Sequence, residues 1–116
     1  MMDDSRDELL VLWTSDDKEA ARQMVLLYSE NAQRQGWWDQ VTVLIWGSSA
    51  ALAASDTHIQ AYLEKLQDAG VRVIACKACA RNLGVVEDLE RLNIDVFYTG
   101  ELLTEWLKSD RKVLSV

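Results

Sequence analysis

Short runs of apolar residues alternate along this chain with stretches in which apolar residues recur every three or four positions. The runs predict five β-strands, near residues 8–13, 41–46, 71–76, 94–98 and 112–116. The first three runs are almost entirely apolar, which is typical of strands buried on both faces of a parallel sheet.

The stretches between the strands are predicted to be helices. Two of them carry a clear apolar stripe, one ending at Gly36 and the other at Gly70; their members are Ala20, Ala21, Met24, Leu27 and Tyr28, and then Ile59, Tyr62, Leu63 and Leu66. Shorter helices are expected over residues 50–54, 77–83 and 87–92. A last helix over 101–109 is expected to bury Leu102, Leu103, Trp106 and Leu107.

Strands and helices that alternate with short connections predict the α/β class. The expected architecture is a three-layer α/β/α sandwich around a five-stranded, mostly parallel sheet. Because 116 residues are enough to bury a substantial core, we expect residues 1–116 to form a single domain.

Charge and composition indicate which partners the protein is expected to bind and in which compartment we expect it. The net charge of −7 argues against nucleic acid, whose phosphates are bound by Lys and Arg. No apolar run is long enough to span a bilayer, so no membrane partner is expected. The acidic start, MMDDSRDELL, lacks the features of a signal peptide, and we expect a cytoplasmic location. Two cysteines are too few for a disulfide scaffold and are expected to be thiols.

The chain's two cysteines, Cys76 and Cys79, follow the third strand in a C-x-x-C spacing. Parallel sheets bind ligands at the carboxyl ends of their strands, and a helix that starts there directs free N–H groups and partial positive charge at the site. A thiol at this position is biased towards the reactive thiolate. Both cysteines are therefore candidate catalytic residues.

Small and polar residues are expected at the same edge of the sheet and are candidate binding residues: Gly47, Ser48, Lys77, Thr99 and Gly100. A glycine and a hydroxyl after a parallel strand can bind an anion, and Lys77 would add positive charge. No G-x-G-x-x-G or G-K-[ST] motif is present, and a tight turn from strand to helix explains Gly47 and Ser48 equally well.

Four explanations of the C-x-x-C are considered. A structural zinc site needs four ligands, whereas one such pair and a distant histidine are present, so no metal is expected. A thioredoxin-like dithiol depends on a cis-proline, and this chain has no proline. A thiol that carries sulfur as a persulfide, with a neighbour to resolve it, and two cysteines that merely pack in the core stay open. No cofactor is expected.

Three further residues have two possible roles. His58, in the first turn of a helix beside Asp56, is expected to be a solvated surface residue, with a catalytic base as the alternative. Trp37 and Trp38 precede the second strand and either cover the rim of the core or form a subunit contact, where tryptophan is favoured.

The second half of the chain contains a recognisable series of short motifs. They are a strand with a terminal cysteine, a helix ending near L-G, a short acidic helix, a strand with a terminal glycine, and a final helix and strand. These parts are Val71, Val73 and Cys76; Leu83 and Gly84; Glu87, Asp88 and Leu89; 96–100; 102–107; and Val113 and Leu114. With this series, the first strand, its helix and the turn at Trp46 and Gly47, nearly the whole chain resembles the DsrE/DsrF family of small sulfur-transfer-related proteins.

The resemblance implies a DsrEFH-like five-stranded parallel α/β/α fold and a homo-oligomer, often a trimer or hexamer. It also implies that Cys76 is the sulfur carrier, because the matching cysteine has this role in relatives that act in sulfur relay. Cys79, where many relatives have no cysteine, would be the resolving thiol. Such a carrier needs sulfur donor and acceptor proteins. The alternative is a non-catalytic oligomeric module that binds a small anion or a protein partner.

Overall fold

The computed structural model describes residues 7–116. Most of the acidic start, on which the expected cytoplasmic location rests, lies outside the described residues. Five parallel strands form one sheet in the order β4-β3-β2-β1-β5. Their bounds are β1 Glu8–Trp13, β2 Gln40–Ile45, β3 Arg72–Cys76, β4 Asp95–Phe97 and β5 Lys112–Ser115. The predicted fold class is confirmed, and the sheet is parallel throughout.

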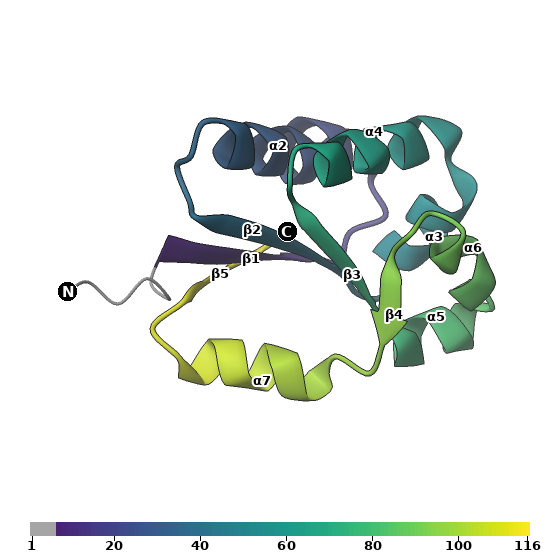
Figure 1. The fold of residues 1–116 in the computed structure, drawn as a ribbon. Helices are drawn as coiled ribbons and strands as arrows, with labels where there is room; N and C mark the ends of the chain where they lie inside the picture. The colour runs from purple at the N-terminus through teal and green to yellow at the C-terminus, as the bar shows by residue number, and fades with distance from the viewer. Residues whose placement is uncertain (1–6) are drawn as a thin grey trace.

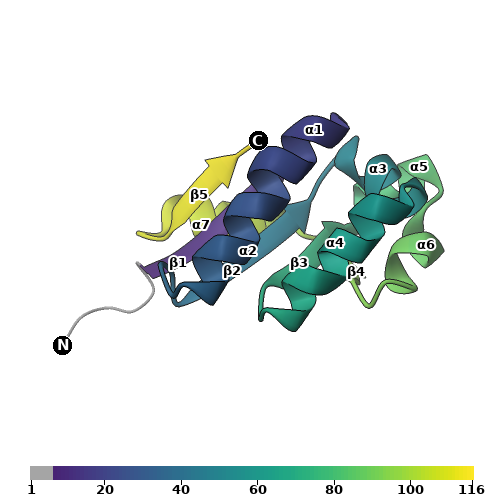
Figure 2. The ribbon, with the colours of Figure 1, turned by 90° about the horizontal axis from the view of Figure 1, so that it is seen from above.

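Helices cover both faces of the sheet and form the three expected layers (Figure 1). One face carries a continuous helical segment made of α1 (Lys18–Ala20), η2 (Ala21–Leu26) and α2 (Leu27–Arg34), together with α4 (Thr57–Asp68). Seen from above, α2 and α4 run side by side across this face (Figure 2). The other face carries α7 (Gly100–Lys108).

Three short helices gather beyond the carboxyl ends of β2 and β3, at one end of the molecule (Figure 1): α3 (Ser49–Ser55), α5 (Lys77–Leu83) and α6 (Val86–Glu90). The turn into α3 needs Gly47, whose φ of +69° is unfavourable for a residue with a side chain. Behind it, the buried Ser49 hydroxyl donates to the Trp13 carbonyl at 2.6 Å and accepts from the Trp46 N–H at 3.2 Å. These bonds hold the ends of β1 and β2 together.

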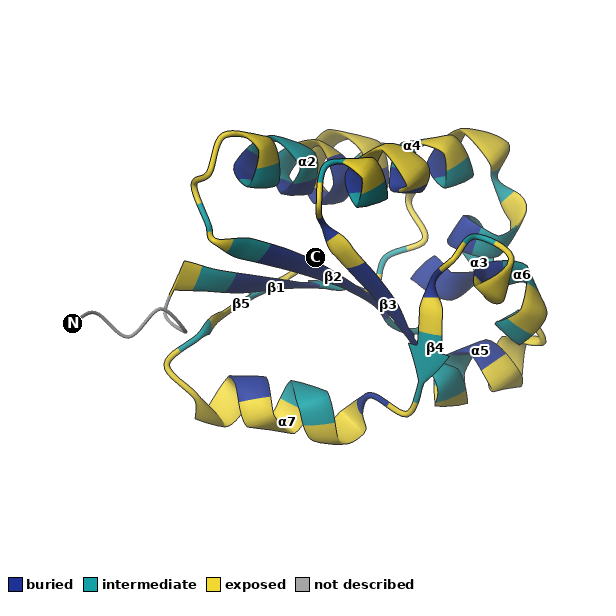
Figure 3. Cartoon of the chain, viewed as in Figure 1, coloured by how far each residue is buried: buried dark blue, intermediate teal, exposed yellow. Residues whose placement is uncertain are grey.

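The core divides unequally between the two faces of the sheet (Figure 3). The larger cluster packs the α2 and α4 side of the sheet and includes Val11, Val43, Leu26 and Leu63. The smaller cluster, on the α7 side, has four buried members: Leu10, Leu44, Ile74 and Trp106. Around it, six apolar side chains are only partly buried: Leu12, Trp46, Phe97, Leu102, Leu103 and Val113.

The first helix differs from its prediction because η2 is a π-helix. Its wider turn contains an extra residue, which rotates the buried stripe relative to an α-helical pattern. Val25 and Leu26 are therefore buried, while Met24 and Leu27, expected on the inner side, are exposed. On α7, Trp106 is buried as predicted, but Leu107 is 64% exposed, so its prediction was wrong.

Candidate functional site

Cys76 is the last residue of β3 and the N-cap of α5. Because successive residues of a strand point to opposite faces, Cys76 follows Ile74 towards the α7 side of the sheet. Its side chain is 4% exposed. Its Sγ accepts a hydrogen bond from the backbone N–H of Cys79 at 3.4 Å, so the thiol occupies the position of a helix-capping group.

Cys79 lies in the first turn of α5 and its thiol faces Cys76. The S–H of Cys79 donates to the Sγ of Cys76 with 2.9 Å between the two sulfur atoms. Burial raises the pKa of the Cys79 thiol above its ordinary value, the hydrogen bond to Cys76 raises it further, and a backbone interaction with Gly47 acts in the opposite direction. Cys79 is therefore held as a protonated donor, and Cys76 is the sulfur that receives hydrogen bonds.

Both thiols line a cavity of about 550 Å³ whose walls come from the carboxyl ends of β2, β3 and β4, from α5 and from the start of α7. The walls are largely apolar and aromatic. The other lining residues are Trp46, Ala78, Asn82, Tyr98, Thr99, Gly100 and Glu101. A thiol pair that lines such a cavity, with Cys76 buried and Cys79 half-buried, can react with a small molecule or with an extended chain end that enters it.

The five candidate binding residues differ in whether they line the thiol cavity. Thr99 and Gly100 line the cavity. The backbone of Gly47 lowers the pKa of the Cys79 thiol, although Gly47 does not line the cavity. Ser48 is exposed and does not line the cavity either. Lys77 turns to the aromatic ring of Tyr98, with its Nζ 5.5 Å from the ring centre.

Sequence reasoning missed Trp46 and Tyr98 as lining residues. Both directly follow a strand, β2 and β4 respectively, at the edge of the sheet that holds Cys76. Aromatic residues that follow neighbouring parallel strands are a signal that could have identified them.

His58 and the two tryptophans lie elsewhere. His58 lies in the first turn of α4 at the surface, where its Nδ1 is 3.4 Å from the Lys18 Nζ, and it does not line the thiol cavity. Trp38 is partly buried against the larger core cluster and donates from its Nε1 to the Tyr28 hydroxyl at 3.0 Å. Trp37 is exposed.

The profile of the DsrE/DsrF-like family matches residues 9–116, which is almost the entire chain. The chain belongs to this family. Among proteins with curated descriptions, none matches it. The family match shows the family and the extent of the chain that belongs to it, and it assigns no chemistry to the site.

Two solved structures are similar to this DsrE/DsrF-like chain. A conserved protein of unknown function from Bacteroides thetaiotaomicron, BT1422, is 35% identical with a TM-score of 0.95, and the match covers 100% of both chains. The ychN protein from E. coli is 19% identical with a TM-score of 0.66, covering 94% of this chain and 97% of that one. The second likeness shows the fold alone.

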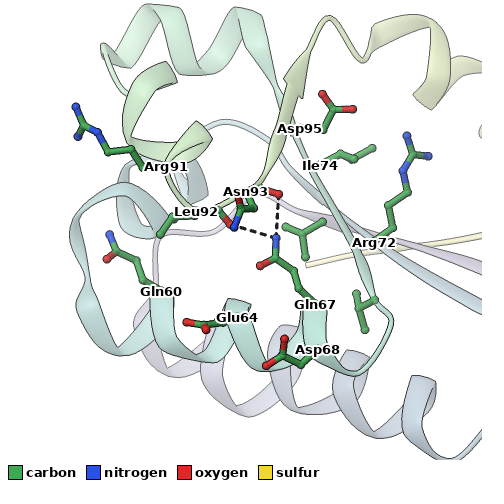
Figure 4. A pocket seen from close by; sticks show the side chains of 12 residues that line it. Gln60, Glu64, Gln67, Asp68, Arg72, Ile74, Arg91, Leu92, Asn93 and Asp95 are labelled. Atoms are coloured by element: carbon green, nitrogen blue, oxygen red, sulfur yellow. Dashed lines mark hydrogen bonds between the residues drawn. The ribbon is translucent and has the colours of Figure 1, made fainter.

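A second cavity, of about 620 Å³, lies between α4 and the first half of β3, at the end of that strand away from Cys76 (Figure 4). Its wall is braced by Gln67, whose Nε2 donates to the carbonyls of Leu92 and Asn93 at 3.3 and 3.2 Å. Its charged residues have both signs: Glu64, Asp68, Arg72, Arg91 and Asp95. The cavity contains no thiol, histidine or hydroxyl that could act as a nucleophile or base.

Two kinds of feature are absent from residues 7–116 of the DsrE/DsrF-like chain. Within them, no group of three or more His, Cys, Asp or Glu side chains is placed to hold a metal ion. Over the same residues, every helix is too short or too polar to cross a bilayer.

Proposed function

We propose that this protein is a persulfide carrier that takes up sulfane sulfur on Cys76 and passes it on. The observation that supports it is the asymmetry of the thiol pair: the Sγ of Cys76 accepts hydrogen bonds from both the N–H and the S–H of Cys79. Two donors aimed at one sulfur mark Cys76 as the acceptor of the pair, and in a thiol pair the sulfur that acts as nucleophile is the one that carries no donated proton.

Uptake is a single displacement. The Cys76 thiolate attacks the outer sulfur of a persulfide donor, R–S–SH; the donor's S–S bond breaks, and R–S⁻ leaves with the electron pair. Cys79, whose raised pKa keeps it protonated, does not compete for the donor at neutral pH. The product is a Cys76 persulfide at the base of the cavity.

Release can follow two routes. An acceptor thiolate attacks the outer sulfur of the Cys76 persulfide and leaves with it, which restores the Cys76 thiolate. Alternatively, Cys79 gives up its proton and attacks the inner sulfur; a Cys76–Cys79 disulfide forms and the outer sulfur leaves as HS⁻. The second route needs an external dithiol to reduce the disulfide before another cycle. Donor and acceptor are proposed to be proteins of a sulfur relay in the cytoplasm, where thiols stay reduced.

We also propose a homo-oligomer, a trimer or hexamer, assembled through the α7 side of the sheet. Six apolar side chains remain partly exposed around α7, and Leu107 projects from it. One of the six, Trp46, also lines the thiol cavity. A neighbouring subunit on this face would therefore also shield the thiols from water.

Selective alkylation tests this function against the alternative of a non-catalytic binding module. Folded protein is treated with a limiting amount of iodoacetamide at neutral pH, and the alkylated cysteine is located by peptide mass mapping. Modification of Cys76 ahead of Cys79 supports thiol chemistry. Two thiols that react only after unfolding would contradict it and favour the binding module.

A further inference from the structure

Thr99 has an unpaired hydroxyl inside the site. The residue is 1% exposed, and within residues 7–116 its Oγ1 has no hydrogen-bond partner. Thr99 also lines the cavity that contains both thiols. A buried hydroxyl without a partner costs free energy of folding, and a valine of the same shape would avoid that cost. The hydroxyl is therefore unexplained by the packing of the protein alone.

Thr99 also lies at a position where a threonine hydroxyl usually makes a capping hydrogen bond. It is the N-cap of α7, a nine-residue helix, and threonine at an N-cap commonly accepts a hydrogen bond from the first turn. Here the side chain makes no such bond. The first N–H groups of α7, those of Gly100 and Glu101, have no intrahelical partner, and both residues line the cavity. Free N–H groups at a helix start attract anions.

Two cations of α5 contact Tyr98, which lies on the cavity wall. The Nζ of Lys77 is 5.5 Å from the Tyr98 ring centre, and Nη1 of Arg81 donates to the Tyr98 hydroxyl at 2.8 Å. Neither cation lines the cavity itself, and the charged lining residue within residues 7–116 is the exposed Glu101. The attraction for an anion therefore comes from the Thr99 hydroxyl and the N–H groups at the start of α7.

We infer that Thr99 and the start of α7 form a subsite for the oxyanion end of a small sulfane-sulfur donor of the thiosulfonate class, of which thiosulfate is the simplest. This inference rests on the proposed function, because it adds a small-molecule donor for Cys76 to the proposed donor protein. The Cys76 thiolate attacks the outer sulfur of thiosulfate, the bond between the two sulfur atoms breaks, and sulfite leaves with the electron pair. The product is a Cys76 persulfide anion, and the charge that develops on sulfite faces the Thr99 hydroxyl and the helix N–H groups.

Binding is measured without chemistry by using the Cys76→Ser protein. Thiosulfate is titrated into ¹⁵N-labelled protein, and the amide signals of Gly100 and Glu101 are followed by NMR. We expect these signals to shift, and we expect a further Thr99→Val substitution to weaken binding about tenfold, the size of one hydrogen bond to a charged group. The matched control is Thr104→Val on the same helix, whose exposed hydroxyl bonds the Gly100 carbonyl, and it should leave the affinity unchanged.

A second comparison distinguishes the loss of the Thr99 hydroxyl from a folding defect of the variant. Thr99→Ser keeps the hydroxyl and should keep the affinity, and Thr99→Val should unfold at the same temperature as its parent or a higher one. Equal affinities with valine and threonine at position 99, or no binding of thiosulfate at millimolar concentration, would overturn the subsite. Sulfuration of Cys76 by inorganic polysulfide, which has no oxyanion, reports on the carrier function separately. Sulfuration by polysulfide should be equally fast in wild type and in Thr99→Val. If polysulfide does not sulfurate Cys76 in the wild-type protein, that result contradicts the carrier function and leaves the subsite untouched.

Discussion

The sulfur atoms of Cys76 and Cys79 lie 2.9 Å apart, with Cys79 as the hydrogen donor and Cys76 as the acceptor. In the proposed function, this direction makes Cys76 the nucleophile and Cys79 the partner that can later supply a proton or form a disulfide bond. The spacing of three residues across the start of a helix produces the arrangement, because side chains at i and i+3 lie on the same side.

The two thiols should close a disulfide on mild oxidation. Treatment of the wild-type protein with oxidised glutathione is expected to remove two hydrogen atoms from the intact mass, with little stable glutathione adduct, because the second thiol is already in place to displace it. Cys79→Ser should instead retain glutathione on Cys76. A wild-type protein that accumulates glutathione on both cysteines would contradict the geometry.

Stability above pH 9 should depend on Cys79. The folded-state pKa of this thiol is raised above the ordinary value of 9.0, so its contribution is present below that value and is lost as the pH rises through the folded pKa. The free energy of unfolding of wild type relative to Cys79→Ser is therefore expected to fall as the pH rises above 9.0 and through the folded-state pKa of Cys79. Guanidinium unfolding under reducing conditions measures it. Both proteins contain Tyr62, whose raised pKa acts in a similar range, so its effect cancels. Parallel curves for the two proteins would contradict the shift.

Ser49 should contribute to stability far more than its neighbour. Ser49→Ala removes the buried hydroxyl that joins the Trp13 carbonyl and the Trp46 N–H, and it is expected to lower the free energy of unfolding by about 1–2 kcal/mol. The exposed Ser48→Ala is the control and should change it by less than about 0.5 kcal/mol. Urea unfolding measures both, and equal effects would show that the link between β1 and β2 is unimportant.

The oligomer should depend on the α7 face. Sedimentation velocity at micromolar concentration is expected to show a trimer or hexamer for the wild type and smaller species for Leu107→Glu, because a buried charge in an apolar contact is costly. Leu83→Glu, at another exposed leucine, on α5, should leave the assembly unchanged. A monomeric wild type would refute the assembly, and a loss of assembly with Leu83→Glu alone would move the contact to a different face.

The sheet was predictable because the strands are short apolar runs separated by helical patterns, a signal that depends on local sequence. Cys76 was predictable at the end of a strand for the same reason. The exposure of Met24 and Leu27 was not predictable, because the π-helical turn of η2 changes which residues face the core. The spacing of apolar residues gives no sign of such a turn. The unpaired hydroxyl of Thr99 was not predictable either: threonine at that position predicts a cap, and only the three-dimensional structure shows that no cap is made.

The intact mass of the protein reports sulfur uptake by Cys76. Reduced wild-type protein, Cys76→Ser and Cys79→Ser are each incubated with a small persulfide donor and analysed by mass spectrometry without reductant. We expect Cys79→Ser to gain one sulfur atom, and wild type to gain it or to form the Cys76–Cys79 disulfide with release of sulfide. Cys76→Ser should gain none. A wild type that stays unmodified and releases no sulfide, or an adduct that survives Cys76→Ser, would rule out Cys76 as the sulfur carrier.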